Sequence, residues 1–172
     1  MCVVKPTIYL FTDGASSGNP GPGGYGVILR CGMHEKEMSA GFAMTTNNRM
    51  ELLAVIVGLE AIKWEKAVVE VYSDSRYIVD AVNNGWLFNW EKNDWKKSDK
   101  KKAENIDLWE RFLVVYRKHK VTFKWVHGHA GHPENERCDS LAVAAREAPL
   151  LPPDTGYEAI KAETTDTDLT LL

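Results

Sequence analysis

Short runs of β-branched and aromatic residues, separated by polar and glycine-rich stretches, mark the first part of the chain. Residues 7–12 (TIYLFT) predict a buried strand, and residues 25–30 (YGVILR) predict a second strand after the turn-rich loop at 14–24 (GASSGNPGPGG). Residues 35–44 mix charged and apolar side chains and predict a third strand. Because these strands follow one another without an intervening helix, we expect an antiparallel meander.

Helical periodicity replaces this pattern after residue 46. From Asn47, apolar residues recur at helical spacing, which predicts an amphipathic helix with one face on the core. Strands and helices then alternate to the end of the predicted fold. The later elements are a strand at 68–73 (VVEVYS), a short helix at 75–83, a helix from Ile106, a strand at 121–126 (VTFKWV) and a last helix at 134–146.

Three strands in a run, followed by alternating helices and strands, predict an α/β protein with a mixed five-stranded sheet and helices packed on it. Ligands of such sheets gather at the carboxyl ends of parallel strands. Asp13 and Asp74 follow the first and fourth predicted strands, so both emerge at one edge if these strands are parallel neighbours. Glu51 lies early in its helix and can lean over the same edge.

Four acidic residues, each in a separate and well-marked motif, are the candidate functional groups. They are Asp13 in FTDGASSGNPGPGGYG (11–26), Glu51 in TTNNRMELLA (45–54), Asp74 in YSDSRYI (72–78) and Asp139 in WVHGHAGHPENERCDSLA (125–142). Carboxylates gathered from distant parts of a chain repel one another unless cations lie between them. Hard oxygen ligands favour magnesium or manganese over zinc. Two such ions about 4 Å apart can clamp the attacking and leaving oxygens of a phosphodiester.

Each polar residue at this edge also has an ordinary interpretation when taken alone. An aspartate before glycine, as at Asp13, is common in turns, and Asp74 or Asn47 can cap the helix that follows. Glu51 alone is typical of a solvated helix position. Asn47 and Asn48 can equally hydrogen-bond to base edges or sugar hydroxyls, so both interpretations stay open.

The segment GPGGYG (21–26) matches the GxGxxG pattern of dinucleotide-binding turns. That fingerprint requires a helix to follow, whereas a β-branched pair follows at 27–28, so dinucleotide binding is excluded. We expect Gly14, Gly18 and Gly21 instead to let the backbone approach something large, such as a sugar–phosphate chain.

Three histidines in the segment 127–132, His127, His129 and His132, raise the question of a zinc site. The segment is glycine-rich, lies between a predicted strand and a predicted helix, and has no cysteine pair to complete a tetrahedral set, so structural zinc is disfavoured. We interpret His129 as a histidine beside the metal centre that moves protons near neutral pH.

The insert at 85–102 combines tryptophans with lysines. These residues are Trp86, Trp90, Trp95, Lys92, Lys96, Lys97, Lys100, Lys101 and Lys102. Trp86 and Trp90 are four positions apart, so packing along a helix explains that pair as well as ligand binding does. The dense lysines indicate phosphate contacts, although three acidic residues in the insert reduce its charge from six positive to a net of three.

Composition adds few further constraints. At 172 residues the chain suits one domain with a real core, and its 44% hydrophobic and 26% charged residues are typical of a globular protein. Residues 148–172 carry a net charge of −4, so the rest of the chain carries +1, the difference from the total of −3. Three cysteines without a CxxC pair suit a reducing cytoplasm. We recognise no signal peptide and no apolar run long enough to span a membrane.

With the four motifs in this order, the chain closely resembles the type 1 ribonucleases H of bacteria from about residue 6 to residue 146. The blocks that carry the resemblance are TDG…GNPGPGGYG, TTNNRMEL, SDS and GHAGHPENERCD…A. The resemblance implies the ribonuclease H-like fold, with strand order 3-2-1-4-5 and helices on both faces. It also implies a monomeric endonuclease that cleaves the RNA strand of RNA–DNA hybrids, leaving 5′-phosphate and 3′-hydroxyl ends. Two Mg²⁺ ions, replaceable by Mn²⁺, would serve each site.

The resemblance also assigns roles to individual residues. By the family pattern, the four acidic residues are metal ligands and catalytic groups, and His129 matches a loop histidine that assists proton transfer or product release. Thr46 matches a contact to a DNA phosphate, and Asn135 lies in the flank of the site. The remaining positions implied to contact the hybrid are Asn19, Asn47 and Asn48, with Trp86, Trp90, Lys96 and Lys97 in the part that grips the DNA strand.

Two features depart from the family pattern. The insert is shorter and more acidic than strongly basic versions, which weakens the expectation of tight hybrid binding. We expect residues 1–147 to form the catalytic domain, whereas 148–172 lie outside the family core and have a composition that predicts disorder.

The expected mechanism is in-line attack on phosphorus by a water that one ion activates, while the second ion stabilises the departing 3′-oxygen. Asp13 is expected to bridge the ions because a strand-end aspartate is short and rigidly held. Contacts to 2′-hydroxyls would select RNA. A binding module that has lost catalysis is the main alternative, and nothing in the motifs supports such a loss. A transposase, resolvase or reverse transcriptase domain is disfavoured by the GHAGHPEN block and the insert.

Overall fold

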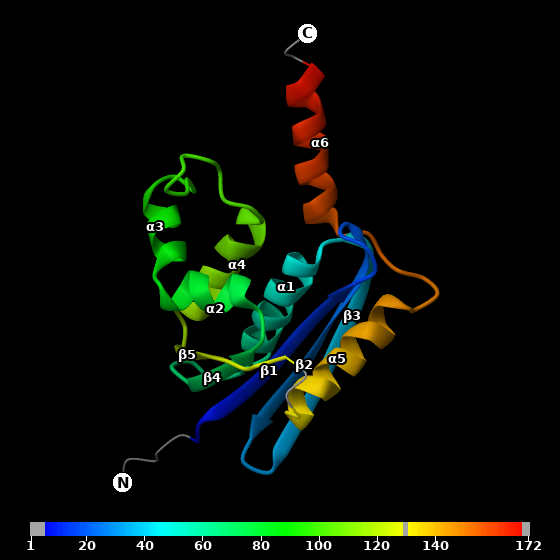
Figure 1. Ribbon diagram of the computed structural model, residues 1–172. Helices are drawn as coiled ribbons and strands as arrows, with labels where there is room; N and C mark the ends of the chain where they lie inside the picture. Colours follow the sequence, from blue (N-terminus) through cyan, green and yellow to red (C-terminus); the bar gives the residue numbers. More distant parts are fainter. Residues whose placement is uncertain (1–5, 129–130, 170–172) are drawn as a thin grey trace.

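The computed structural model describes residues 6–128 and 131–169, which form one five-stranded sheet with helices on both faces (Figure 1). The strands are β1 (Ile8–Ser16), β2 (Gly21–Cys31), β3 (His34–Thr45), β4 (Val68–Ser73) and β5 (Lys120–Trp125), and the helices are α1 (Asn47–Glu60), α2 (Arg76–Asn83), α3 (Trp86–Lys92), α4 (Ile106–Tyr116), α5 (Pro133–Arg146) and α6 (Thr155–Leu169). The strand order is β3-β2-β1-β4-β5. β1, β2 and β3 pair antiparallel, whereas β4 is parallel to both β1 and β5. The predicted fold class, strand order and helix-covered faces are confirmed.

Alternation of side chains along the strands assigns the two faces of the sheet to different helices. Leu10 of β1 packs against Gly58 of α1, and α4 packs on the same side of the sheet. On the opposite face, Gly24 and Gly26 of β2 lie against the backbone of α5. The main core fills the α1 face, where Leu10, Ile56 and Phe112 are fully buried.

The glycine-rich stretch at 14–24, predicted to be a loop, is mostly strand. β1 continues to Ser16 and β2 begins at Gly21, so that only residues 17–20 connect the two strands. A Cβ on Gly14 would overlap the backbone of Glu51, and one on Gly26 would overlap the carbonyl of Cys138. Gly14 therefore lets a helix, rather than a sugar–phosphate chain, approach the strand.

The C-terminal residues 148–172, predicted to be disordered, contain a helix and a buried carboxylate within their described part. α6 projects away from the sheet (Figure 1), and Asp154, just before it, is only 7% exposed. Asp154 accepts hydrogen bonds from Arg49 and Thr45. Disorder was predicted because the segment contains PPDTG and is rich in Thr and Asp, and composition does not register a buried ion pair with a distant residue.

The helices were compared with the length and apolar character of a membrane-spanning segment. Within residues 6–128 and 131–169, none combines the length and apolar character that crossing a bilayer requires.

Gly26→Ala tests whether close packing of α5 on β2 is required. The added Cβ would overlap the Cys138 carbonyl, so we expect the free energy of unfolding to fall by about 2–3 kcal/mol in urea denaturation. Gly32→Asn is the matched control, since Gly32 lies in the open β2–β3 turn with φ +58°, which asparagine tolerates. Equal losses in the two variants would contradict the packing argument.

Candidate metal centre and nucleic-acid surface

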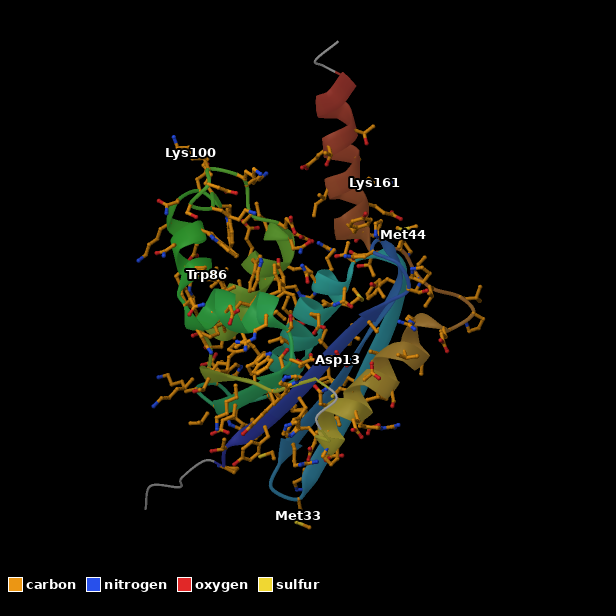
Figure 2. All side chains as sticks on the ribbon, in the orientation of Figure 1. Asp13, Met33, Met44, Trp86, Lys100 and Lys161 are labelled. Carbon is orange, nitrogen blue, oxygen red and sulfur yellow. The ribbon has the colours of Figure 1, made fainter. Side chains whose placement is uncertain are left out.

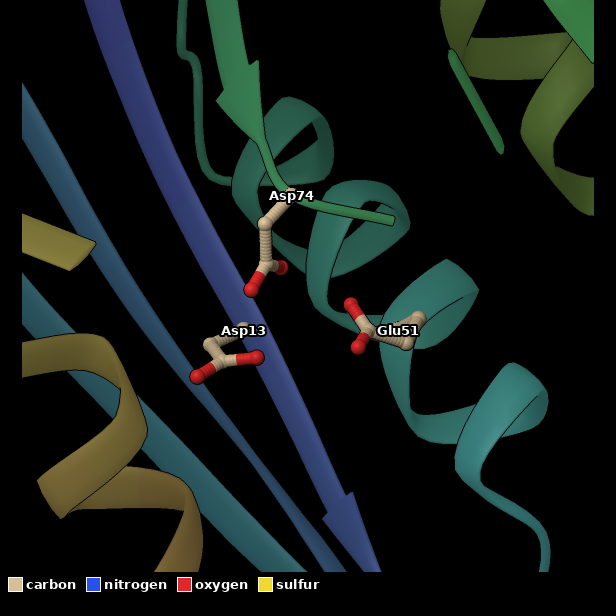
Figure 3. A group of neighbouring side chains, drawn as sticks. All are labelled: Asp13, Glu51 and Asp74. Carbon is tan, nitrogen blue, oxygen red and sulfur yellow. The ribbon is translucent and has the colours of Figure 1, made fainter. Parts of the chain in front are cut away.

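Three carboxylates from distant parts of the chain meet at one edge of the sheet (Figure 3). Asp13 comes from β1, Glu51 from α1 and Asp74 from the residue after β4. Each contributes one oxygen to a group in which all three oxygens lie within 4.8 Å of one another. Of the described residues, these three form the only group with the spacing of a metal site.

Strand pairing explains why Asp13 and Asp74 are neighbours. Phe11 of β1 pairs with Tyr72 of the parallel strand β4, and each aspartate lies two residues further along the chain, Asp13 within β1 and Asp74 just after the end of β4. Asp13 is not at a strand end as predicted, because β1 continues and pairs Asp13 with Gly26. Glu51 reaches the aspartates because Gly14 admits the backbone of α1 against β1.

Asp139 approaches the same edge from the other face of the sheet. It follows Cys138 on α5, whose carbonyl lies against Gly26, the residue paired with Asp13. Its carboxyl group is within hydrogen-bonding reach of the Asp13 carboxyl and raises the pKa of Asp13. The structure thus brings all four predicted acidic residues to one place, with Asp139 outside the tightest group of three.

Burial and mutual repulsion make this cluster unfavourable without a cation. Burial, followed by the charges of Asp74 and Asp139, raises the pKa of Asp13 from 3.8 to about 7. Burial, followed by the charges of Asp13 and Asp74, raises the pKa of Glu51 well above 4.5. The Gly14 N–H donates to Asp13 at 2.8 Å, but Glu51 Oε2 is buried with no hydrogen-bond partner among the described residues. This donor set fits a hard divalent cation.

A polar surface lies beside the cluster, where α1 begins. Thr46 is the N-cap of α1 and its hydroxyl accepts from the Arg49 N–H at 3.3 Å, so of the two interpretations of Asn47 the structure excludes the helix cap. Asn47 is the first helical residue and donates to Glu51 at 3.4 Å. Asn19 accepts from the Asn47 N–H at 3.1 Å, which ties the β1–β2 connection to α1. Asn48, half-buried, lies in the same first turn.

The tryptophan–lysine insert, residues 85–102, forms a second surface at some distance from the sheet, where Figure 2 labels Trp86 and Lys100. Trp86 is 47% exposed, whereas Trp90 packs edge-on against Trp109 at 6.1 Å between ring centroids. Packing therefore accounts for Trp90, whereas a binding role for the exposed Trp86 stays a prediction. A hollow of about 680 Å³ is lined by Trp86, Asn89, Trp90, Asn93, Lys96, Lys97, Ser98 and Lys100.

Two predicted site residues remain, Asn135 and His129. Asn135 is 6% exposed, lies in the first turn of α5 and lines a cavity of about 400 Å³ with Phe11 and Tyr72, which precede Asp13 and Asp74 by two residues in the chain. His129 lies outside the described residues, so its role stays a prediction.

Comparison with known proteins agrees with this geometry. A family model described as RNase H matches residues 5–147, most of the chain. The chain belongs to the ribonuclease H family. A curated ribonuclease H from Desulforamulus reducens is 60% identical over 147 residues, covering 86% of this chain and 92% of that protein.

Two solved structures support the assignment to type 1 ribonuclease H made from the sequence. The structure of LC9-RNase H1, described as a type 1 RNase H with the type 2 active-site motif, has a TM-score of 0.75 and 33% identity, covering 85% of this chain and 74% of that chain. LC11-RNase H1 in complex with an RNA/DNA hybrid has a TM-score of 0.60 and 25% identity, covering 81% of this chain and 96% of that chain. The resemblance to type 1 ribonucleases H that the sequence motifs indicated is confirmed.

Sequence reasoning missed one buried charge of this ribonuclease H. Arg49, 1% exposed, stands between the two asparagines and Glu51 and pairs with Asp107 and Asp154. A basic residue beside an apolar helical stripe was the available signal, but its partners lie 58 and 105 residues away.

The raised pKa of Asp13 predicts how the stability of the metal-free ribonuclease H depends on pH. Because the folded state favours the protonated carboxyl, the associated stability is fully present below pH 3.8 and is lost as the pH rises through about 7. This difference in pKa corresponds to about 4 kcal/mol at most. Asp13→Asn should therefore raise the free energy of unfolding at pH 8 in chelator and flatten its pH dependence.

Urea denaturation at pH 5 and pH 8, with chelator and with Mg²⁺, checks this expectation. Mg²⁺ should stabilise the wild type at pH 8 and have much less effect on Asp13→Asn. Asp80→Asn, in an exposed i,i+4 pair on α2, is the control and should behave as wild type. An unchanged pH dependence in Asp13→Asn would show that the cluster is not repulsive.

Proposed function

We propose that this ribonuclease H hydrolyses the RNA strand of RNA–DNA hybrids as a metal-dependent endonuclease. The observation that carries the proposal is the convergence of Asp13, Glu51 and Asp74 within 4.8 Å, with one oxygen of Glu51 buried and unpartnered among the described residues. A protein does not maintain such repulsion without compensation, and a bound cation supplies it. The hybrid in the LC11-RNase H1 structure supports the choice of substrate.

The four carboxylates would hold two Mg²⁺ ions, for which Mn²⁺ can substitute. When bound, these ions supply activation of the attacking water and stabilisation of charge on the departing oxygen. Asp13 is the carboxylate whose pKa is raised by both Asp74 and Asp139, so it would be the central ligand of the site. In-line attack on phosphorus with departure of the 3′-oxygen leaves 5′-phosphate and 3′-hydroxyl ends. His129 would move the proton to the departing oxygen.

Two surfaces would hold the hybrid on either side of the chemistry. Asn19 and Asn47, joined by a hydrogen bond, and the neighbouring Asn48 would face the minor groove, where the 2′-hydroxyls distinguish RNA from DNA. Thr46 would contact a DNA phosphate, and Asn135 would line the flank of the site. In the insert, Trp86, Trp90, Lys96 and Lys97 would hold the DNA strand through its phosphates and sugars.

We further propose that residues 1–147 form the catalytic domain and that the protein acts as a monomer in the cytoplasm. Cys138 is buried and Cys31 is half-buried, and both are free thiols, which suits a reducing compartment.

Asp13→Asn should reduce cleavage of a labelled RNA–DNA hybrid by at least about a thousandfold while the protein stays folded, because it removes the central metal ligand. The assay compares RNA–DNA, RNA–RNA and DNA–DNA duplexes, each with Mg²⁺ and with chelator. Only the hybrid with Mg²⁺ should be cut by the wild type, and Asp80→Asn should match it. Near wild-type cleavage by Asp13→Asn, or cleavage in chelator, would overturn the proposed metal centre.

Replacing Lys96 and Lys97 with alanine should weaken hybrid binding without changing which strand is cut. If each lysine contacts one phosphate, the slope of log affinity against log salt should fall by about one per lysine. Fluorescence anisotropy at several salt concentrations, in the Asp13→Asn background, measures this slope. Lys36→Ala, on the edge strand β3, is the matched control, and equal slopes in all variants would exclude the insert from the interface.

A further inference from the structure

A buried arginine beside the candidate active site is held by two carboxylates from other parts of the chain. The Arg49 guanidinium donates two hydrogen bonds to Asp107, at 2.8 and 2.9 Å, and two to Asp154, also at 2.8 and 2.9 Å. Its side chain is 2% exposed, that of Asp154 is 9% exposed and that of Asp107 is 37% exposed. We call these three residues the Arg49 clamp.

Asp154 is the deeper of the two carboxylates and makes further contacts. Its carboxylate also accepts from the Thr45 hydroxyl at 2.7 Å and from the Tyr157 N–H at 3.1 Å. Burial alone would raise the pKa of Asp154, but the hydrogen bonds from Arg49 and Thr45 lower it, so the carboxylate stays charged. Beside it, the Ala43 N–H donates to the Pro152 carbonyl at 2.9 Å.

The chain that carries Asp154 also covers the clamp. A Cβ on Gly156 would overlap both the Asp107 carboxylate and the Arg49 guanidinium, so the backbone of this segment lies directly on the ion pairs. Pro152, Asp154 and Gly156 therefore hold this segment against the body of the protein. They lie beyond residues 5–147, the part that the ribonuclease H family model matches.

The clamp joins the two surfaces that the proposed function assigns to the hybrid. Arg49 directly follows Asn48 on α1, so its position sets that of the first turn of α1. Asp107 lies in the first turn of α4, the helix that follows the tryptophan–lysine insert. Asn105, which accepts from Arg49 at 3.4 Å, donates to Tyr77 of α2 at 3.1 Å. One network thus connects the asparagine turn, the helix after the insert and the helix after Asp74.

We propose that residues 152–158 are a positioning element for the substrate: Asp154, through Arg49, fixes the asparagine turn at 46–48 relative to the tryptophan–lysine insert. This inference rests on the proposed function. Asp154 acts through Arg49 and contributes no atom to the group of Asp13, Glu51 and Asp74. Loss of Asp154 therefore impairs simultaneous engagement of both surfaces more than it impairs the chemical step.

A purely structural role and a positioning role predict different kinetics. Breaking a buried ion pair destabilises a protein in either case. If the clamp only stabilises the fold, a folded variant assayed well below its unfolding temperature binds and cleaves the hybrid as the wild type does. If the clamp positions the two surfaces, KM rises while kcat changes little, and fewer phosphates are contacted at once.

The experiment uses full-length Asp154→Asn and measures kcat and KM on a labelled hybrid with Mg²⁺, at least 15 °C below the unfolding midpoint of each variant. At this margin each variant is folded, so a change in KM does not reflect partial unfolding. We expect KM to rise about five- to tenfold with kcat within about twofold of wild type. In the Asp13→Asn background, the salt slope of hybrid binding should fall by about one or more.

Three further variants separate the clamp from its surroundings. Thr45→Val removes one hydrogen bond to Asp154 and should raise KM by less than Asp154→Asn does. It tests the positioning role if Asp154→Asn does not fold. Ala162→Pro interrupts α6 beyond the clamp and should leave KM unchanged. Glu60→Gln breaks the exposed pair with Arg111, at 2.7 Å, and is the matched control for loss of an arginine–carboxylate contact.

Wild-type KM and salt slope in folded Asp154→Asn, or in Thr45→Val if that is the variant that folds, would overturn the positioning role. A rise in KM for Ala162→Pro equal to that for Asp154→Asn would also overturn it, because α6 rather than the clamp would then be responsible. Failure of the wild type to cleave any hybrid would instead overturn the proposed function.

Discussion

Two helices pack against opposite faces of one strand pair at a separation that only glycine permits. α1 lies on Gly14 of β1 and α5 lies on Gly26 of β2, the residue paired with Asp13. This close packing brings Glu51 and Asp139 to Asp13 from the two sides of the sheet, and parallel pairing of β1 with β4 brings Asp74 from a third direction. The acidic cluster exists because the backbone around it is closely packed.

This close packing holds like charges together, and burial of the apolar core must offset the free energy of their repulsion. Burial and neighbouring charges raise the pKa of Asp13 to about 7 and that of Glu51 well above its usual range. The apolar side chains buried between α1, α4 and the sheet stabilise the fold enough to hold the carboxylates together. A divalent cation between the carboxylates turns the repulsion into attraction, so the site and its ion are expected to stabilise each other.

Arg49 and Glu51 are both buried, but only Arg49 has hydrogen-bond partners for all its polar atoms. In the Arg49 clamp, every group of the guanidinium faces a carboxylate or an amide, and Asp154 is further held by Thr45. At Glu51, one carboxylate oxygen has no partner among the described residues. Complete satisfaction is typical of a structural contact, whereas an unpartnered buried oxygen indicates a ligand position. The contrast separates the supporting Arg49 from the candidate ligand Glu51, although both lie on α1.

Local patterns in the sequence were sufficient for most of the fold. Local patterns predicted all five strands and the helices α1, α2, α4 and α5, because a period of two or of 3.6 is visible within each segment by itself. The helix α3, inside the tryptophan–lysine insert, was not predicted as a separate element. The four acidic motifs were recognisable because each is a contiguous stretch of the sequence. The parallel pairing of β1 with β4 was only a condition of the sequence argument, and the strand order was implied by the family resemblance; the structure confirms both.

Tertiary structure alone decided the features that depend on distant partners. Glycine in 14–24 predicted a loop because its lack of a side chain resembles a turn signal, and only the approach of α1 and α5 shows why strands need glycine there. Thr46 rather than Asn47 became the helix cap through the exact start of α1. The described part of the tail is held at Asp154, whose partner Arg49 is 105 residues away in the sequence. Amino-acid composition contains no information about such a pairing. Sequence therefore determined which elements and which chemical groups this ribonuclease H possesses, whereas packing between elements determined how closely those groups meet.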